Sequence, residues 1–168
     1  NLVQFNFKQA VKKNISIIVC GSDSDKAAAK KIKKISGIQN IENKARDGSL
    51  LERVELIANA KLLITNDTCA LHIGASLNTK TICITNGLHF GRFHPYPDEM
   101  SNFVKTIYPD DDLIKNGNFD FLARKFHLGS ELDIDQISPV KVLHHVREFR
   151  KQKRRKSNWL IDQMNKVK

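Results

Sequence analysis

The chain has 168 residues, with 28 lysines and arginines against 18 acidic residues and a net charge of +10. This length is enough for one domain with its own core, and 40% hydrophobic and 27% charged residues are typical of a soluble globular protein. No apolar run approaches the roughly 20 residues of a membrane-spanning helix, and the N-terminal residues do not resemble a secretory signal. Because the chain begins with Asn1 rather than Met, we expect it to be a piece of a longer protein or a processed product.

The positive charge is concentrated at the C-terminal end. Residues 141–168 hold ten basic residues and two acidic ones, whereas residues 1–140 are nearly balanced. A solvated helix face is the first interpretation of the basic run at 151–156, and attraction to anionic lipid headgroups is the second. Nucleic-acid binding is not expected, because no aromatic platform or recognition motif accompanies the run. We therefore divide the chain into a domain at 1–140 and a basic amphipathic helical tail at 141–168.

The three cysteines are isolated and lack the spacing of metal ligands. Cys20 and Cys83 lie in apolar runs, so we expect buried thiols in a reducing, cytoplasmic compartment.

Apolar, strand-like runs alternate with helical patterns along most of the chain. We expect strands at 16–20, 38–41, 61–65, 81–84 and 103–108, and helices at 28–35, 50–57 and 68–77. Ser49 and Glu52 have the S-x-x-E spacing of a capping box, which predicts a helix start. Ser138–Pro139 predicts another. Adjacent acidic residues at 110–112 are interpreted as a solvated turn. Strands and helices in this order predict an α/β fold with a parallel sheet covered by helices on both faces.

The most informative segment, residues 65–72, lies where a strand ends and a helix begins. Ligands of open α/β sheets bind beyond the carboxyl ends of the strands, and a helix start offers unpaired N–H groups that favour a phosphate or pyrophosphate. Small side chains at 68–70 would let the backbone approach such a ligand, and His72 would direct its imidazole at the same oxygens. The alternative is that Asp67 or Thr68 is only an N-cap and that His72 is a half-buried, hydrogen-bonded residue.

Asp67-Thr68-Cys69-Ala70-Leu71-His72, followed by a small-residue helix, a strand and Asn86-Gly87, resembles the D-[ST]-G-x-x-H region of the heptosyltransferase-like glycosyltransferase family 9. Upstream, Cys20-Gly21-Ser22 is similar to the family's first strand with its Gly turn, and residues 49–61 are similar to the helix before the D-[ST]-G strand. Downstream, residues 89–97 and 137–140 resemble a loop of some members and the start of the C-terminal helix. The resemblance covers most of residues 15–145. Cys69 departs from the family pattern, which usually has Gly there.

The resemblance implies a GT-B protein, in which two Rossmann-like domains face each other across a cleft. This chain would be the C-terminal, donor-binding half, and the donor would be a nucleotide sugar such as ADP-heptose. The acceptor would be a glycan or glycolipid, in lipopolysaccharide or another cell-surface glycan. The implied donor-binding residues are Gly21, Ser22, Glu52, Asp67, Thr68, Cys69, Ala70, His72, Gly87 and Arg92. In the family, a Glu on this helix holds the ribose hydroxyls. That Glu aligns with Leu51 of this chain, and Glu52 is the next residue.

Chemically, the resemblance implies glycosyl transfer with inversion. A catalytic base is assigned to no residue here, because the family's base is an acidic residue of the other domain. Neither a cofactor nor a metal is expected, since a helix N-terminus, Thr68, His72 and Arg92 would stabilise the departing diphosphate. The location would be cytoplasmic, with the basic tail on the inner membrane face or packed against the other domain.

Three alternatives remain open from the residues alone. The loop at 89–96, with two His, one Arg and three aromatic residues, is either a flap that contacts sugar or base or a loop held in place by its aromatic side chains. The whole chain is either a glycosyltransferase half or a non-catalytic nucleotide- or phosphate-binding module with a basic interaction tail. A nucleotide-sugar epimerase comes last, because no G-x-G-x-x-G follows the first strand.

Overall fold

The computed structural model describes residues 15–36, 40–45 and 48–151. The chain divides into two compact units, Asn1–Arg53 and Val54–Lys168. Within the described ranges, no helix has both the length and the apolar character needed to cross a bilayer.

The first unit is built on two parallel strands and a helix. β1 (Ile17–Gly21) leads through a short turn into α2 (Lys26–Ser36), and β2 (Ile41–Ala45) pairs with β1. Ala29 of α2 is buried together with Ile41 and Ala45 at the two ends of β2. The strand expected at 38–41 instead begins at Ile41 and runs to Ala45. The prediction missed its extent because the residues between Ile41 and Ala45 are polar and lack an apolar pattern.

The second unit contains a three-stranded parallel sheet in the order β3–β4–β5. Its strands are β3 (Leu63–Asn66), β4 (Thr81–Ile84) and β5 (Val104–Ile107), with α3 (Leu50–Asn59) entering from the first unit and α4 (Cys69–Ser76) between β3 and β4. The single continuous sheet expected from the sequence is therefore represented, among the described residues, by two parallel ladders.

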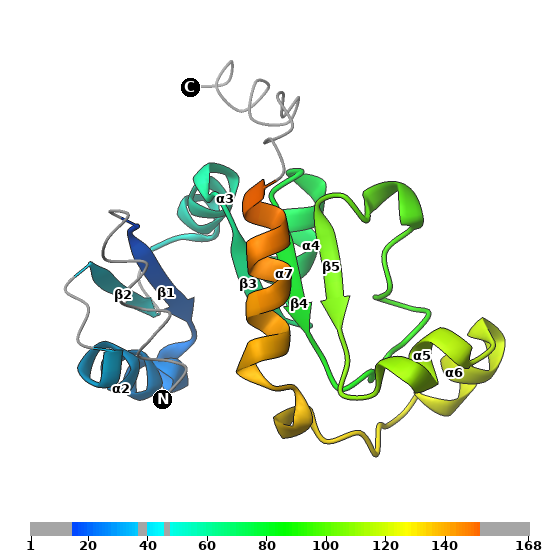
Figure 1. Ribbon diagram of the computed structural model, residues 1–168. Coiled ribbons are helices and arrows are strands. Elements are labelled where there is room, and N and C mark those ends of the chain that lie inside the picture. The colour runs from blue at the N-terminus through cyan, green and yellow to red at the C-terminus, as the bar shows by residue number, and fades with distance from the viewer. Residues whose placement is uncertain (1–14, 37–39, 46–47, 152–168) are drawn as a thin grey trace. The chain divides into compact units, whose positions relative to one another are not determined.

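Helices cover both faces of the three-stranded sheet, and the central strand β4 shows why. Successive strand side chains point to opposite faces. Cys83 packs with Leu71 and Ala75 of α4, whereas Ile82 packs on the other face with Phe149 of α7 (Pro139–Lys151). Figure 1 shows α4 and α7 on opposite sides of this sheet. Burial on both faces favours apolar and β-branched residues, which explains Ile82, Cys83 and Ile84; the buried Thr81 hydroxyl donates to the Thr79 carbonyl oxygen.

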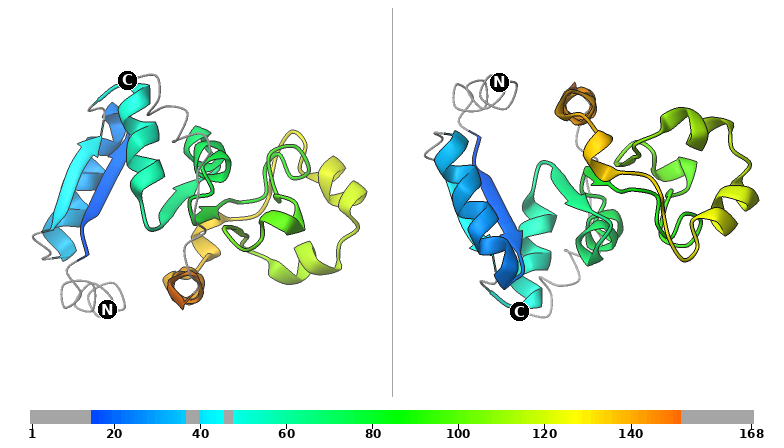
Figure 2. Two further views of the ribbon diagram at one scale, coloured as in Figure 1. Left: turned by 90° about the horizontal axis from the view of Figure 1, so that it is seen from above. Right: turned by 90° about the horizontal axis from the view of Figure 1, so that it is seen from below.

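Two short helices follow β5, where the sequence pattern weakens. α5 (Asp111–Asn116) and α6 (Phe119–Lys125) lie beyond the β5 edge of the sheet (Figure 2). They enclose a separate cluster of buried side chains, namely Phe90, Tyr108, Leu122 and Phe126. Asp110 accepts a hydrogen bond from the Leu113 N–H at 2.8 Å and so caps α5. The acidic run therefore starts a helix instead of forming an isolated turn.

The first part of the expected basic tail belongs to α7. Phe149 is 5% exposed in the core between α7 and the sheet, and Lys80 donates a hydrogen bond to its carbonyl oxygen. The remainder of the tail, residues 152–168, lies outside the described residues, so its contact with a membrane or another domain stays a prediction.

Candidate functional site

The opening of α4 lies directly beyond the carboxyl end of β3. Thr68 precedes the helix in an extended conformation (φ −142°), but its hydroxyl does not cap the first turn; it lies 3.2 Å from the Thr65 hydroxyl. Among the described residues, the N–H groups of Cys69 and Ala70 have no hydrogen-bond partner. Thr68 and Cys69 are exposed. The helix thus presents donors and the positive end of its dipole to solvent, as an anion site requires.

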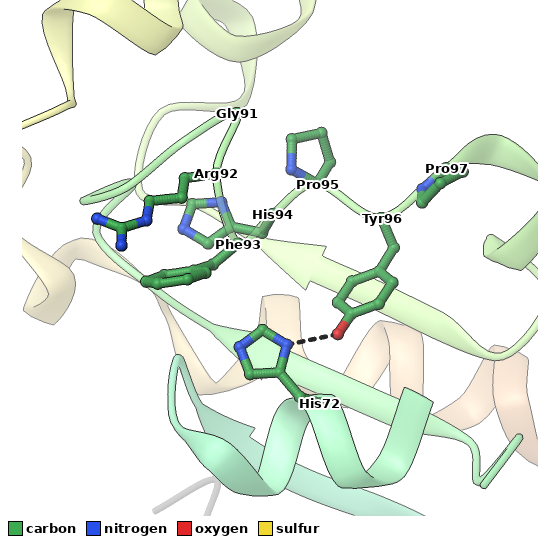
Figure 3. Close-up of a pocket in the computed structure, with 8 residues that line it drawn as sticks. All are labelled: His72, Gly91, Arg92, Phe93, His94, Pro95, Tyr96 and Pro97. Carbon is green, nitrogen blue, oxygen red and sulfur yellow. Dashed lines mark hydrogen bonds between the residues drawn. The ribbon is translucent and has the colours of Figure 1, made fainter. Parts of the chain in front are cut away.

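A cavity of about 450 Å³ lies beside this helix (Figure 3). Its lining residues are His72, Gly91, Arg92, Phe93, His94, Pro95, Tyr96 and Pro97. His72 stands four residues after Thr68, so the two share one face of α4. The remaining lining residues belong to the loop between β4 and β5. The predicted residues His72 and Arg92 are thereby brought to one cavity.

His72 is held by aromatic side chains of the loop. Its Nδ1 lies 2.6 Å from the Tyr96 hydroxyl, and its ring meets Phe93 edge-on, with centroids 5.6 Å apart. The Arg92 guanidinium lies over the Phe93 ring, 4.8 Å from its centroid. Burial raises the pKa of Tyr96, with smaller contributions from Cys83 and Asp67, so the hydroxyl keeps its proton. The His72 imidazole and the Arg92 guanidinium therefore both border the cavity.

His94 anchors the same loop from inside. It is 1% exposed; its Nδ1 lies 2.9 Å from the Tyr108 hydroxyl and its Nε2 lies 2.9 Å from the Leu88 carbonyl oxygen. Asp67, at the end of β3, places a carboxylate oxygen 3.6 Å from the same Nε2. Burial lowers the pKa of His94 and outweighs the opposing effects of the Leu88 carbonyl and Asp67. Asp67 therefore contacts His94, the buried residue that anchors the loop.

The two interpretations of the 89–96 loop apply to different parts of it. Phe90 and His94 are buried and fix the loop to the domain. Gly91 has a positive φ of 81°, and a Cβ there would lie 2.8 Å from that of Ala123, so the close turn requires glycine. Arg92 and Phe93 are exposed and border the cavity. Aromatic anchoring is thus observed, and a flap contacting sugar or base stays a prediction for the exposed part.

Gly87 occupies a turn in the interior of this unit. Its φ is +91°, and its N–H donates to the Thr85 hydroxyl at 3.1 Å. A Cβ at this position would meet the side chains of Leu132 and Phe126, and Gly87 does not line the cavity. Its observed contribution is to let the chain turn after β4.

Gly21 ends β1 and Ser22 follows it, both in the first unit. The Asp25 carboxylate accepts hydrogen bonds from the Ser22 N–H at 2.7 Å and from its hydroxyl at 2.6 Å. These bonds lower the pKa of Asp25. A Cβ at Gly21 would lie 2.5 Å from the same carboxylate, which explains the glycine. The donors that a ligand phosphate would use here are occupied by Asp25.

Glu52 forms the capping box that its spacing predicts. Its carboxylate accepts the Ser49 N–H, and its own N–H donates to the Ser49 hydroxyl at 3.3 Å. The Ser49 backbone bond is the main cause of a lowered pKa at Glu52. This role at the start of α3 is confirmed, whereas the contact of Glu52 with a ribose remains a prediction.

Histidine and acidic side chains also meet on α7. His144, His145 and Glu148 place one ligand atom each within 4.8 Å of one another. Glu148 is paired with His145 at 2.9 Å and with His144 at 3.4 Å. The group lies outside the cavity lining. Of the cysteines, Cys83 is buried as expected, but Cys20 is exposed.

Sequence reasoning missed the hydroxyl partners of the two loop histidines. Tyr96 belongs to the loop that the sequence singles out, but its pairing with His72, 24 residues away, has no local sequence signal. Tyr108 was assigned only to the end of a strand. The sequence offered only indirect evidence for these contacts. The His-rich loop at 89–96 and Asp67 both follow strands at the same edge of the sheet, so they could be expected to lie close together.

The second unit has a parallel sheet with helices on both faces and a cavity beside a helix that starts at a strand end. These features define a Rossmann-like α/β domain of the kind found in GT-B glycosyltransferases. The chain belongs to Glycosyltransferase family 9 (heptosyltransferase), whose sequence profile matches residues 7–119.

Two solved structures share the fold. The glycosyl transferase family 9 protein of Veillonella parvula DSM 2008 superposes with a TM-score of 0.60 at 15% identity, over 88% of this chain and 39% of its own. The ADP-heptose LPS heptosyltransferase II of E. coli gives 0.56 at 19% identity, over 85% and 38%. The chain therefore spans about two fifths of either protein. No match was found among curated proteins.

Proposed function

We propose that the chain is the donor-binding half of a glycosyltransferase that uses a nucleotide sugar of the ADP-heptose type to build lipopolysaccharide or another cell-surface glycan. Membership of family 9 supports glycosyl transfer, and the name of the E. coli neighbour supports the donor and the glycan. The observation that carries the proposal is the cavity beside the open start of α4, bordered by His72 and Arg92.

The geometry suits the diphosphate of the donor. The free N–H groups of Cys69 and Ala70, with the Thr68 hydroxyl beside them, would donate to phosphate oxygens at the positive end of α4. His72 and Arg92 would donate from the cavity side. When the glycosidic bond to the diphosphate breaks, negative charge grows on these oxygens, and fixed donors stabilise that charge without reorganising. This part of the chemistry needs no metal.

The rest of the chemistry belongs to the acceptor side. Inversion requires a base that removes the proton of the acceptor hydroxyl as it attacks the anomeric carbon. We assign that base to the part of a GT-B protein that this chain does not span. Gly21, Ser22 and Glu52 of the first unit are also proposed to contact a nucleotide sugar, Ser22 after release of its hydrogen bonds to Asp25.

Isothermal titration calorimetry with ADP, UDP, GDP and their sugar conjugates tests this function. We expect an ADP conjugate to bind, and His72→Ala and Arg92→Ala each to weaken binding about tenfold or more, because each removes a hydrogen bond to a charged oxygen. His127→Ala and Arg124→Ala are matched controls, since both side chains are exposed and lie outside the cavity lining.

Three results would count against the function. Nucleotides that fail to bind at any concentration would leave α4 as an ordinary helix start. Binding that is lost equally in the variants and in their controls would place the ligand elsewhere. Equal affinity for ADP and for its sugar conjugate would favour the non-catalytic nucleotide-binding module over the transferase.

A further inference from the structure

Two histidines of the second unit are each paired with a tyrosine hydroxyl through Nδ1. The His72–Tyr96 distance is 2.6 Å at the cavity, and the His94–Tyr108 distance is 2.9 Å in the core. In a neutral imidazole, one nitrogen donates and the other accepts, and the partner of one nitrogen decides the state of the other. The tautomers of both rings can therefore be derived from their partners.

The buried pair gives its tautomer directly. Nε2 of His94 lies 2.9 Å from the Leu88 carbonyl oxygen, which is an acceptor only, so this nitrogen must carry the proton. Burial lowers the pKa of His94, and the ring is neutral. Its Nδ1 then has a lone pair, and Tyr108 donates to it. In this protein, a tyrosine hydroxyl facing Nδ1 acts as the donor.

The same assignment holds for His72 on two grounds. A phenolic hydroxyl is the better donor, because its oxygen shares electron density with the ring, whereas an imidazole lone pair is a strong acceptor. Tyr96 also keeps its proton, because burial raises its pKa, and among the described residues His72 Nδ1 is the partner of this hydroxyl. An N–H at Nδ1 would leave that hydroxyl hydrogen without an acceptor among the described residues.

We propose that Tyr96 is a positioning residue that places the single proton of the neutral form of the His72 ring on Nε2, so that Nε2–H faces the cavity as a donor to an anionic ligand. Figure 3 shows Nδ1 turned to Tyr96 and the second ring nitrogen on the opposite side, where Arg92 and Phe93 lie. The Phe93 ring, edge-on to His72 at 5.6 Å, limits rotation of the imidazole. The anion beside Nε2–H rests on the proposed function, whereas the tautomer is a property of the ligand-free chain.

The tautomer is measured without a ligand. Long-range ¹H–¹⁵N correlation spectra of the full chain, labelled with ¹⁵N in its six histidine rings and recorded above the imidazole titration range, distinguish protonated from unprotonated nitrogens. His72→Gln identifies the His72 signals. We expect wild-type His72 to be protonated at Nε2 only and to become a mixture of tautomers in Tyr96→Phe.

Tyr108→Phe is the matched control, because it deletes the same hydroxyl from the other pair. His94 should stay protonated at Nε2 in this variant, since the Leu88 carbonyl still holds that proton, and His72 should not change. Wild-type His72 protonated at Nδ1 would overturn the proposal even if a variant fails to fold. A folded Tyr96→Phe with unchanged His72 signals would overturn it too.

The effect on the ligand is measured with ADP. Tyr96→Phe should weaken ADP binding about two- to tenfold, the value of one neutral hydrogen bond, and should have no further effect in a His72→Ala background. An equal loss in both backgrounds would show that Tyr96 acts independently of His72 and would refute its positioning role. Absence of ADP binding to the wild type would refute the proposed function while the tautomer result stands on its own.

Discussion

His94 is a buried imidazole with a hydrogen-bond partner at each ring nitrogen. It joins three parts of the second unit: the loop that carries it, Tyr108 after β5, and Asp67 after β3. Burial is the largest influence on its pKa and lowers it. The Leu88 carbonyl and Asp67 raise the pKa, and His89 and His72 lower it further. The net result is a neutral ring that fixes the wall of the cavity.

This protonation state predicts a pH-dependent stability. Unfolded histidine titrates near its ordinary pKa of about 6.5, and His94 in the folded chain titrates lower. As pH falls below that ordinary pKa, the unfolded state binds a proton that the folded state does not, so the free energy of unfolding decreases. This contribution is fully present above the unfolded pKa and is lost progressively down to the folded one.

Urea unfolding of the wild type and of His94→Gln at about pH 8 and about pH 5 measures this effect. The two pH values lie on either side of the ordinary histidine pKa, and the substitution removes the imidazole that titrates between them. We expect the wild type to lose more stability between the two pH values than the variant. His72, His89 and Asp67 remain in both chains, so the difference isolates His94. Equal losses would show that His94 is not held neutral.

At the residue scale, the site was predicted in part. Thr68 at the helix start and His72 and Arg92 at the cavity were derived from a strand–helix junction and a family resemblance. The Tyr96 and Tyr108 contacts were not, because they depend on the path of a loop that runs with a positive φ of 65° at His89. Such a path is determined by tertiary packing, and no period in the sequence encodes it.

Among the elements, α4 shows how small residues position the site. Gly74 is buried, and a Cβ there would lie 2.5 Å from the Thr81 hydroxyl oxygen on β4 and 2.9 Å from Leu63 on β3. The helix therefore approaches the sheet as closely as its backbone permits. This contact fixes the distance between the start of α4 and the strand ends that flank the cavity.

Gly74→Ala should lower the free energy of unfolding by about 1–3 kcal/mol, because one extra methyl group forces the helix and the two strands apart. Alanine favours a helix more than glycine does, so a loss of stability would isolate the packing cost. Chemical denaturation measures it, with exposed Ser76→Ala on the same helix as the control. A stabilised Gly74→Ala would mean that α4 can shift freely on the sheet.

Elements with a strong apolar period were predicted well, and the others were not. β4 was predicted residue for residue, because burial on both faces leaves a short run rich in apolar and β-branched residues. α5 and α6 were missed, since six and seven residues are too few to show a helical period. α6 also exposes Phe119 and Phe121 while it buries Leu122, so hydrophobicity alone does not identify its inner face.

Over the whole molecule, the residues proposed to bind the donor are distributed over both units of the chain. Thr68, His72 and Arg92 belong to Val54–Lys168, whereas Gly21, Ser22 and Glu52 belong to Asn1–Arg53. In the first group, Thr68 and Arg92 are exposed, and His72 and Arg92 line the cavity. In the second group, Asp25 already occupies the Ser22 donors, and Glu52 already caps Ser49. A ligand diphosphate would have to displace one carboxylate from Ser22 at an electrostatic cost.

Hydrogen exchange with and without ADP measures the two contributions separately. We expect slower amide exchange at 66–73, because the ligand would accept hydrogen bonds from the N–H groups at the start of α4. We also expect it at 88–97, because the ligand would order this loop of the cavity. Slower exchange at 17–25 as well would support ligand contact by Gly21 and Ser22. No change there, with protection at α4, would restrict the donor site to the second unit. His72→Ala provides the control: protection that persists undiminished in this variant would arise from nucleotide bound away from the cavity, and the site would then be wrong.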